Sequence, residues 1–432
     1  MESTLESRLS GTKDFLPEDH KYLTFLKKVL RHEFRRNGFR RISTPLMEET
    51  SLLRKAYPEN KNPYGLYSFA SKEWQDIALL PTATVGILRS YREQETFEEL
   101  QPVYYYYMER FFRQGRARKE FYAIWGEVIG ESDPIIDAQN IYMVLTALKK
   151  IGVSQWVQLR VNCYGNHKEM EKYFEELSAF LENKAGVMSQ DVQERMAENP
   201  LAIYFSEDED DMILAASAPK ISKFHKKDSK KYFEAFKMYL DDLEIDYRED
   251  AGLFFTETFY TGVVWQLEDE EGKIIASGGR YDQLLTTLWS PKEYGAAGFS
   301  LDAMYLIESL KTKNITVKNK DHIDLYFVQL GDEAKRTVFP LSLEARAKGI
   351  NTQTSLGTPS MKEQMLKAQR IGATYVVLVG VMEARSWVFQ VRHIESGTQE
   401  EVKKEELIDY IIEKIWKDQL DFYEPSRDLV QG

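Results

Sequence analysis

An aromatic and cationic stretch from Tyr104 to Glu127, YYYYMERFFRQGRARKEFYAIWGE, most strongly limits what this chain can fold into. Aromatic and apolar runs lie on either side of a polar, glycine-containing break, which predicts two antiparallel strands joined by a long loop. The loop carries five cationic side chains, namely Arg110, Arg113, Arg116, Arg118 and Lys119. Guanidinium groups suit phosphate oxygens, so a nucleotide, RNA phosphate or an acidic partner helix could bind here. A solvated basic loop at a sheet edge is the competing interpretation.

Length, net charge and the numbers of cysteines and histidines limit which classes of protein this chain can belong to. A chain of 432 residues predicts two or three domains, and a net charge of −12 argues against a broadly basic nucleic-acid surface. The single cysteine, Cys163, excludes an internal disulfide framework and fits a reducing compartment. One cysteine and six scattered histidines argue against a Cys/His zinc site, so we expect no metal, although an all-carboxylate site stays open. The polar N-terminal residues and the lack of a run of ~18 apolar residues predict a cytoplasmic protein with no membrane contact.

Changes of pattern along the chain predict its organisation. Residues 1–310 form a first domain, which contains a mainly helical insert at about 166–247. The polar, cationic segment 311–321 is expected to be a linker. In residues 322–432, apolar strands alternate with helices, which indicates a small α/β domain with a largely parallel sheet.

Several shorter segments give local expectations. Residues 38–49 predict a strand in which Pro45 favours an edge or an interface. The GGRYD sequence at 278–282 is expected to be a tight turn, since it lacks the lysine and Ser/Thr of a phosphate loop. The acidic run 206–211 is expected to be a solvated loop. His32, His167 and His225 lie in charged stretches and are expected at the surface.

At this point the motifs resemble the histidyl-tRNA synthetase family, a family of class II aminoacyl-tRNA synthetases. GTKDFLP at 11–17 is similar to the family's opening, and GFRRISTPLMEE at 38–49 to the dimer-forming motif 1. Residues 104–127 resemble motif 2, and GFSLD at 298–302 resembles motif 3. The insert and KGINTQTS at 348–355 are also similar to the family. The resemblance implies an α+β fold with a class II antiparallel sheet flanked by helices, a helical insert and a C-terminal α/β anticodon-binding-like domain. It also implies a homodimer whose interface includes Pro45.

The catalytic positions depart from the family's pattern. In an active class II enzyme, a motif 2 arginine binds the α-phosphate of ATP, and a motif 3 arginine lies against adenine and the γ-phosphate. Tyr107 stands at the first position and Tyr305 at the second. Phe255 replaces the arginine of the family's RGLDYY segment, which would contact the activated carboxylate. Removing one transition-state donor typically costs ~10²–10³ in rate, so the resemblance predicts a catalytically degenerate paralogue with no catalytic residue.

The amino-acid pocket implied by the resemblance is altered as well. PEGT reads 81-PTAT-84 here, which removes a carboxylate, and the glutamine behind motif 2 is Ala123, whereas Glu127 is kept. One acidic group among aromatic rings could hold a small cationic or amine ligand. Simple core packing is the alternative. The predicted ligand pocket consists of Thr82, Thr84, Ala123, Glu127, Phe255, Phe259 and Tyr260.

Three functions follow from the resemblance. The first is a non-catalytic regulatory or binding subunit, such as that of short-form ATP phosphoribosyltransferase in histidine biosynthesis, with no cofactor. The second is a divergent but active histidyl-tRNA synthetase, for which ATP and magnesium would be cofactors, if Arg110, Arg113 or Arg116 replaces the lost motif 2 arginine. The third is a paralogue that binds tRNA or another RNA through its C-terminal domain.

Overall fold

In the computed structural model, the described residues are 7–58, 65–71, 76–115, 117–196, 198–289, 294–317, 323–355, 357 and 360–423. Arg116, one of the predicted contacts, lies outside them. The chain forms two compact units, Met1–Val317 and Lys318–Gly432. Each unit has its own hydrophobic core.

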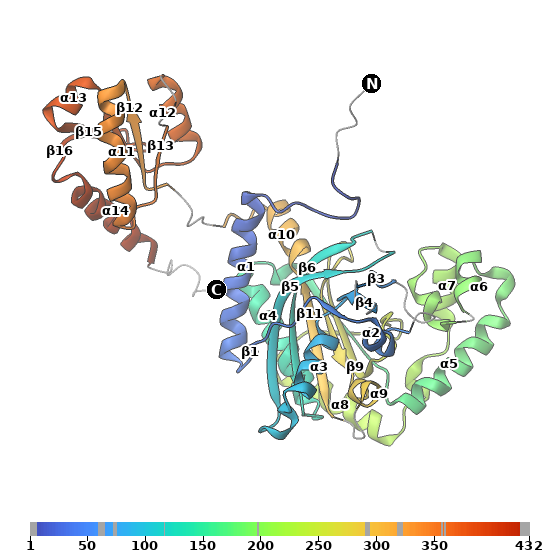
Figure 1. The fold of residues 1–432 in the computed structure, drawn as a ribbon. Helices are drawn as coiled ribbons and strands as arrows, with labels where there is room; N and C mark the ends of the chain where they lie inside the picture. Colours follow the sequence, from blue (N-terminus) through green and yellow to red (C-terminus); the bar gives the residue numbers. More distant parts are fainter. Residues whose placement is uncertain are drawn as a thin grey trace, which may run out of the picture. The chain divides into compact units, whose positions relative to one another are not determined.

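An eight-stranded sheet forms the centre of the first unit (Figure 1). Its strands, in spatial order, are β1 (Arg40–Arg41), β5 (Val103–Phe112), β6 (Glu120–Ile129), β11 (Ala296–Asp302), β10 (Ile274–Arg280), β9 (Thr261–Asp269), β7 (Val157–Cys163) and β8 (Arg248–Glu249). The six inner strands pair antiparallel, and the two-residue strands β1 and β8 pair parallel at the edges. This arrangement matches the predicted antiparallel sheet.

Helices and a small sheet cover the two faces of this central sheet (Figure 1). One face packs against α1 (Pro17–Arg36), α4 (Ile135–Ile151), α8 (Lys227–Asp242) and α10 (Ala303–Thr312). The other packs against α2 (Thr50–Ala56), α3 (Thr84–Glu93), α9 (Leu284–Leu288) and a sheet of β2 (Met47–Glu49), β4 (Asp76–Leu79) and β3 (Ser68–Ala70). Because side chains alternate along a strand, Ile124 and Val128 of β6 face the first layer, while Ala123 and Trp125 face the second.

Segment 166–247 is mainly helical and has a hydrophobic core of its own. It contains α5 (His167–Glu182), α6 (Gln190–Met196) and α7 (Glu209–Ser217), and it ends with α8. Two expectations here need correction. The acidic run 206–211 is a loop only as far as Asp208: residues 207–210 are exposed as expected, but α7 begins at Glu209 and Asp208 caps it. Asp211 is buried, with Ser189 and Ser206 donating hydrogen bonds to its carboxylate. His225 is buried, whereas His32 and His167 are exposed.

Three more expectations need correction. Gly278 to Arg280 belong to β10 rather than to a turn, because β9 and β11 both pair with these residues. Pro45 lies between β1 and β2 and is exposed, so residues 38–49 do not form one continuous strand. The predicted linker began too early, because α10 continues to Thr312. Residues 318–321 of that linker lie outside the described part of the chain.

The second unit carries a five-stranded sheet in the order β13 (Thr352–Thr354), β12 (Leu325–Gln329), β14 (Tyr375–Val379), β15 (Val388–His393) and β16 (Gln399–Lys403). The first three strands pair parallel, but β15 and β16 pair antiparallel, so the sheet is mixed rather than largely parallel. Its helices are α11 (Asp332–Ala347), α12 (Met361–Arg370), α13 (Val381–Ser386) and α14 (Leu407–Tyr423). Among all described helices of both units, none is long and apolar enough to cross a membrane.

Candidate functional site

The candidate site lies on the face of the central sheet that α2, α3 and α9 cover. Tyr107 of β5 and Ala123 and Glu127 of β6 all point toward this face, since they alternate with residues of the opposite core. Glu127 is opposite Gly298 of β11 in the strand register. A Cβ atom on Gly298 would lie 1.9 Å from Oε2 of Glu127, so only glycine leaves room for this carboxylate.

Glu127 is fully buried, and its acceptors are already used inside the protein. The hydroxyl of Thr84 donates to Oε1 at 2.7 Å, and the hydroxyl of Tyr281 donates to Oε2. Burial raises the pKa of Glu127 to about 8, because desolvation of the charged form outweighs these two hydrogen bonds. The carboxyl group therefore stays mainly protonated up to about pH 8, and a cationic ligand would stabilise the ionised form.

Aromatic rings pack next to the partner of this carboxylate, since the ring of Tyr281, which donates to Glu127, lies 6.1 Å from that of Phe259. The ring of Phe259 lies 5.7 Å from that of Tyr57 and 4.8 Å from that of Tyr260, and Phe255 lies 4.9 Å from Tyr260. The hydroxyls of Tyr57 and Thr82 share a hydrogen bond. Contacts therefore link Thr82, Phe259, Tyr260 and Phe255 in series through Tyr57, and a separate contact joins Thr84 to Glu127. Ala123 is buried in the hydrophobic cluster that also contains Tyr57 and Tyr281.

The residue expected at the family's motif 2 arginine position is a packed phenol, Tyr107. Tyr107 is fully buried, and its hydroxyl donates to the carbonyl of Thr44 at 2.9 Å. Its ring packs 5.8 Å from that of Phe111. A neutral, hydrogen-bonded phenol at this place cannot neutralise a phosphate.

Tyr305, the residue expected at the family's motif 3 arginine position, contacts an acidic side chain of the central sheet. Tyr305 is buried at the start of α10, and its hydroxyl donates to Asp269 at the end of β9. Its backbone N–H donates to the carboxylate of Asp302 at 2.9 Å, which makes Asp302 the N-cap of α10. Burial raises the pKa of Asp302, although Arg118 donates to its Oδ2 at 2.7 Å.

The described arginines of the loop each have an acidic partner. Arg110 pairs with Glu120, and its guanidinium lies 5.2 Å from the ring of Phe15. Phe15 packs against the core of the opposite sheet face, so Arg110 points away from Glu127. Arg118 pairs with Asp302 and lies 3.8 Å from the carboxylate of Glu308.

Arg113 is the described loop arginine that reaches the predicted pocket. Its Nε donates to the carbonyl of Pro81 at 3.1 Å, and its NH2 group lies 3.9 Å from the carboxylate of Glu257. Its guanidinium also covers the ring of Phe121, with 4.7 Å to the ring centroid. Arg113 therefore connects the segments that carry Thr82 and Phe255.

Four residues of this site were not recognised from the sequence. Tyr57 and Tyr281 contribute the hydroxyls that bind Thr82 and Glu127, and Glu257 and Asp302 hold Arg113 and Arg118. Tyr281 and Asp302 lie in GGRYD and GFSLD, two motifs that the sequence singles out, but no local signal indicates their contacts with Glu127 and Arg118. Within the described residues no group of three or more His, Cys, Asp or Glu side chains could hold a metal ion.

Sequence comparison shows where this fold and site belong. The family model described as histidyl-tRNA synthetase matches residues 11–306, and the anticodon-binding-domain model matches residues 308–414. A histidine–tRNA ligase of Staphylococcus carnosus is 30% identical over 417 residues, which cover 94% of this chain and 97% of that protein. A histidine–tRNA ligase of Halothermothrix orenii is 29% identical and covers 92% of this chain and 97% of that protein.

Solved structures agree with the sequence comparison. The apo histidyl-tRNA synthetase of Staphylococcus aureus superposes with a TM-score of 0.77 at 28% identity, covering 94% of this chain and all of that one. A protein of Bacillus halodurans named as an ATP phosphoribosyltransferase regulatory subunit/histidyl-tRNA synthetase shares the fold, with a TM-score of 0.60 at 19% identity and coverage of 87% and 98%. The chain therefore belongs to the histidyl-tRNA synthetase family of class II aminoacyl-tRNA synthetases.

Proposed function

We propose that this chain is a non-catalytic member of its family that works as a binding or regulatory subunit. The proposal rests on the expected alignment with the family, which puts Tyr107, Phe255 and Tyr305 where the family has arginines. The hydroxyls of Tyr107 and Tyr305 are engaged with Thr44 and Asp269, so neither is positioned to act as a surrogate phosphate ligand. Losing each such donor typically costs ~10²–10³ in rate, and these losses act on the same reaction step.

The loop adds to this argument. Arg110 faces the other side of the sheet, and Arg118 is bound by the carboxylate that caps α10. Bringing Arg118 to a phosphate would break its 2.7 Å contact with Asp302. Arg110 and Arg118 of this motif 2-like loop therefore form ion pairs within the protein.

The partner that best fits a non-catalytic member is a short-form ATP phosphoribosyltransferase, with this chain as a homodimeric regulatory subunit. The neighbour from Bacillus halodurans carries both names in its description, and its likeness extends to the fold. The exposed Pro45, beside the motif 1-like strand β2, is the proposed dimer contact. Mixing the protein with a purified short-form transferase tests the proposal: a stable complex and a higher turnover are expected. Two separate species in gel filtration with unchanged turnover would contradict it.

A second candidate, a divergent active synthetase, is favoured by two observations. Relatives at about 30% identity over nearly the whole chain are named histidine–tRNA ligases. In addition, Arg113 brings a guanidinium into the predicted pocket. This alternative predicts histidine-dependent ATP–pyrophosphate exchange with magnesium that is lost in Arg113→Gln. A paralogue that only binds tRNA would instead show RNA affinity that falls steeply with salt and needs residues of the second unit.

A further inference from the structure

A dense group of lysines lies on the helical insert, outside the site described above. It consists of six residues within positions 220–231, here called the lysine cluster: Lys220, Lys223, Lys226, Lys227, Lys230 and Lys231. The one acidic residue in this stretch is Asp228, so the segment keeps a clear excess of positive charge. All six are exposed, and none forms an ion pair with another described residue. In a chain of net charge −12, such a local excess of positive charge requires an explanation.

The backbone that carries the lysine cluster is firmly anchored. Ile221, in a short 3₁₀ turn (Ile221–Lys223), is buried, and Phe224 packs edge-on against Tyr173 with 5.9 Å between ring centroids. The ring nitrogen Nε2 of His225 lies 3.0 Å from the carbonyl of Cys163. Inward-facing residues therefore separate the lysines and hold the cluster on an ordered surface.

Glu169 fixes the start of α8 and also occupies its N-terminus. Its buried carboxylate accepts hydrogen bonds from the backbone of Lys226 at 2.6 Å, from the hydroxyl of Ser229 at 2.6 Å and from the backbone of Asn166 at 2.8 Å. The N-termini of α5 and α8 consequently lie side by side around one carboxylate. The ammonium groups of the lysines, rather than the helix ends, remain available to an anion.

Like charges held on an ordered surface repel each other, and this repulsion is relieved when an anionic partner binds. We propose that the lysine cluster is a docking surface for an acidic segment of a partner protein. This goes beyond the proposed function, and it holds whether or not the synthetase site is active.

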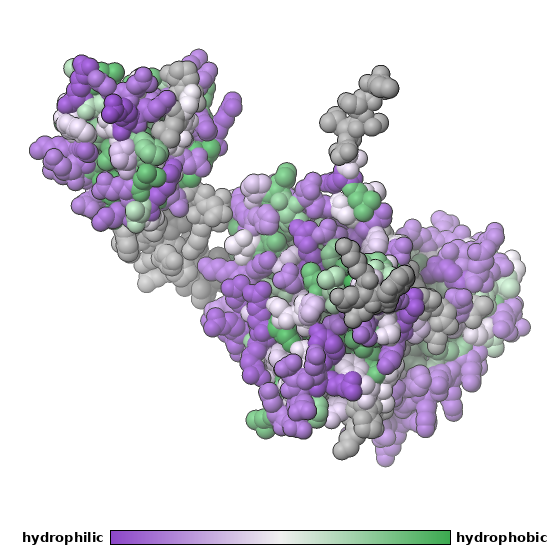
Figure 2. Space-filling model, in the orientation of Figure 1, coloured by the Kyte–Doolittle hydropathy of each residue, from purple (hydrophilic) through white to green (hydrophobic). Residues whose placement is uncertain are grey.

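The surroundings favour a protein over RNA. The rings nearest the lysines point inward: Phe224 packs on Tyr173, and the hydroxyl of Tyr232 donates to the buried Asp137 at 2.7 Å. Single-stranded RNA is usually held by stacking its bases on exposed rings. The visible surface of the insert is largely hydrophilic (Figure 2).

The test compares two probes by fluorescence anisotropy on the full chain: a labelled Glu-rich peptide of about twelve residues, the length of the cluster, and an RNA hairpin of similar net charge. One variant combines Lys223→Gln, Lys226→Gln, Lys227→Gln and Lys230→Gln. A control variant removes the same total charge from other exposed positions, through Lys149→Gln, Lys348→Gln, Lys362→Gln and Lys367→Gln. Circular dichroism and urea unfolding establish that both variants are folded.

The proposal predicts that the native chain binds the peptide more tightly than the RNA. The cluster variant should bind the peptide at least about tenfold more weakly and with a shallower salt dependence, because four charge contacts are lost. The control variant should bind like the native chain. Absence of peptide binding, an equal loss in both variants, or lysine-dependent binding of RNA in preference to the peptide would each overturn the proposal.

Discussion

Arg118 and Asp302 join the motif 2-like loop to the motif 3-like helix through an N–H···O contact of 2.7 Å. The same carboxylate accepts the backbone N–H of Tyr305 at 2.9 Å and so caps α10. One side chain, that of Asp302, thus binds a loop arginine and caps the helix that carries Tyr305, the residue expected at the family's motif 3 arginine position. The loop in this chain is part of the fold's own ion-pair network.

Asp302→Ala should therefore act on stability. Loss of an N-cap costs about 0.5–2 kcal/mol, and the variant should unfold at correspondingly lower urea concentration. Asp302→Asn keeps a capping oxygen and should lose less. Glu308→Gln is the control, since Glu308 is exposed and lies 3.8 Å from Arg118. An Asp302→Ala variant as stable as the native chain would show that this cap is unimportant.

The buried carboxyl of Glu127 predicts a pH dependence. Its pKa is raised to about 8, so the folded state retains a proton that the unfolded chain has already lost between its ordinary pKa and that value. The contribution of this group to stability is full below its ordinary pKa and is lost as the pH rises through about 8. Glu127→Gln, which resembles the protonated form, should gain stability relative to the native chain as the pH rises.

Urea unfolding of both proteins at about pH 5.5 and about pH 8.5 measures this effect, and a relative change of at least ~1 kcal/mol is expected. Glu175→Gln, on the exposed face of α5, is the matched control and should track the native chain at both pH values. A difference between Glu127→Gln and the native chain that stays constant with pH would contradict the raised pKa.

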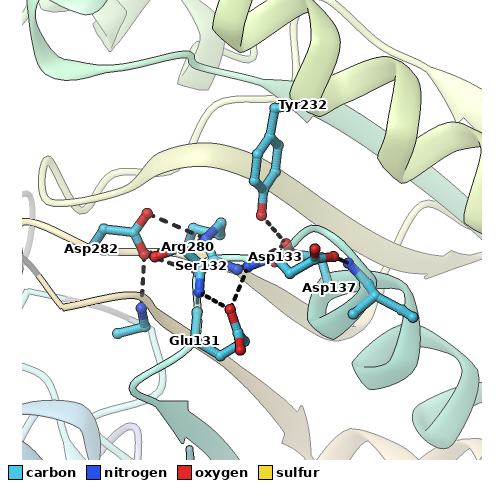
Figure 3. Close-up of polar contacts among 9 residues, drawn as sticks. Glu131, Ser132, Asp133, Asp137, Tyr232, Arg280 and Asp282 are labelled. Atoms are coloured by element: carbon cyan, nitrogen blue, oxygen red, sulfur yellow. Dashed lines mark hydrogen bonds and ion pairs between the residues drawn. The ribbon is translucent and has the colours of Figure 1, made fainter.

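A buried ionic network ties the insert to the central sheet (Figure 3). Arg280 at the end of β10 donates to Asp137 at 3.0 Å, also contacts Asp282, and donates to the carbonyl of Glu131 at 2.5 Å. The hydroxyl of Tyr232 in α8 donates to the same oxygen of Asp137 at 2.7 Å. Arg280 and Asp137 are each only 1% exposed, so removing one partner leaves an uncompensated charge in the interior.

Arg280→Met should accordingly destabilise the first unit by about 3–5 kcal/mol. Tyr232→Phe removes one hydroxyl and should cost about 1–2 kcal/mol while the ion pair remains. Arg195→Met breaks an exposed pair with Asp191 and should cost no more than about 0.5 kcal/mol. Thermal and urea unfolding rank the three variants, and equal losses in Arg280→Met and Arg195→Met would refute the buried network's importance.

The sequence pattern was sufficient to predict those strands and helices whose signals lie within one segment of the chain. Alternating aromatic residues on both sides of a basic break predicted β5 and β6, and apolar residues at helical spacing predicted α1 and α4. The two glycines of GGRYD favour a turn, because glycine weakens a strand locally. Pairing with β9 and β11 on both sides nevertheless keeps these residues in β10.

The candidate site could be predicted only in part, because its contacts join residues that lie far apart in the sequence. The substitutions at Tyr107 and Tyr305 can be read from the sequence, but their hydrogen bonds to Thr44 and Asp269 depend on tertiary packing. Likewise, no local signal distinguishes Arg110 from Arg113. One faces the far side of the sheet and the other reaches the carbonyl of Pro81, as a result of strand alternation and loop geometry.

Histidine-dependent ATP–pyrophosphate exchange, run beside an intact bacterial histidyl-tRNA synthetase, tests the central claim most directly. Because the proposed alignment puts Tyr107, Phe255 and Tyr305 where the family has arginines, the account predicts a rate lower by at least ~10⁴-fold, indistinguishable from a reaction without enzyme. Exchange within about a hundredfold of the intact enzyme, abolished by Arg113→Gln, would contradict the account and establish a working active site rebuilt around that arginine.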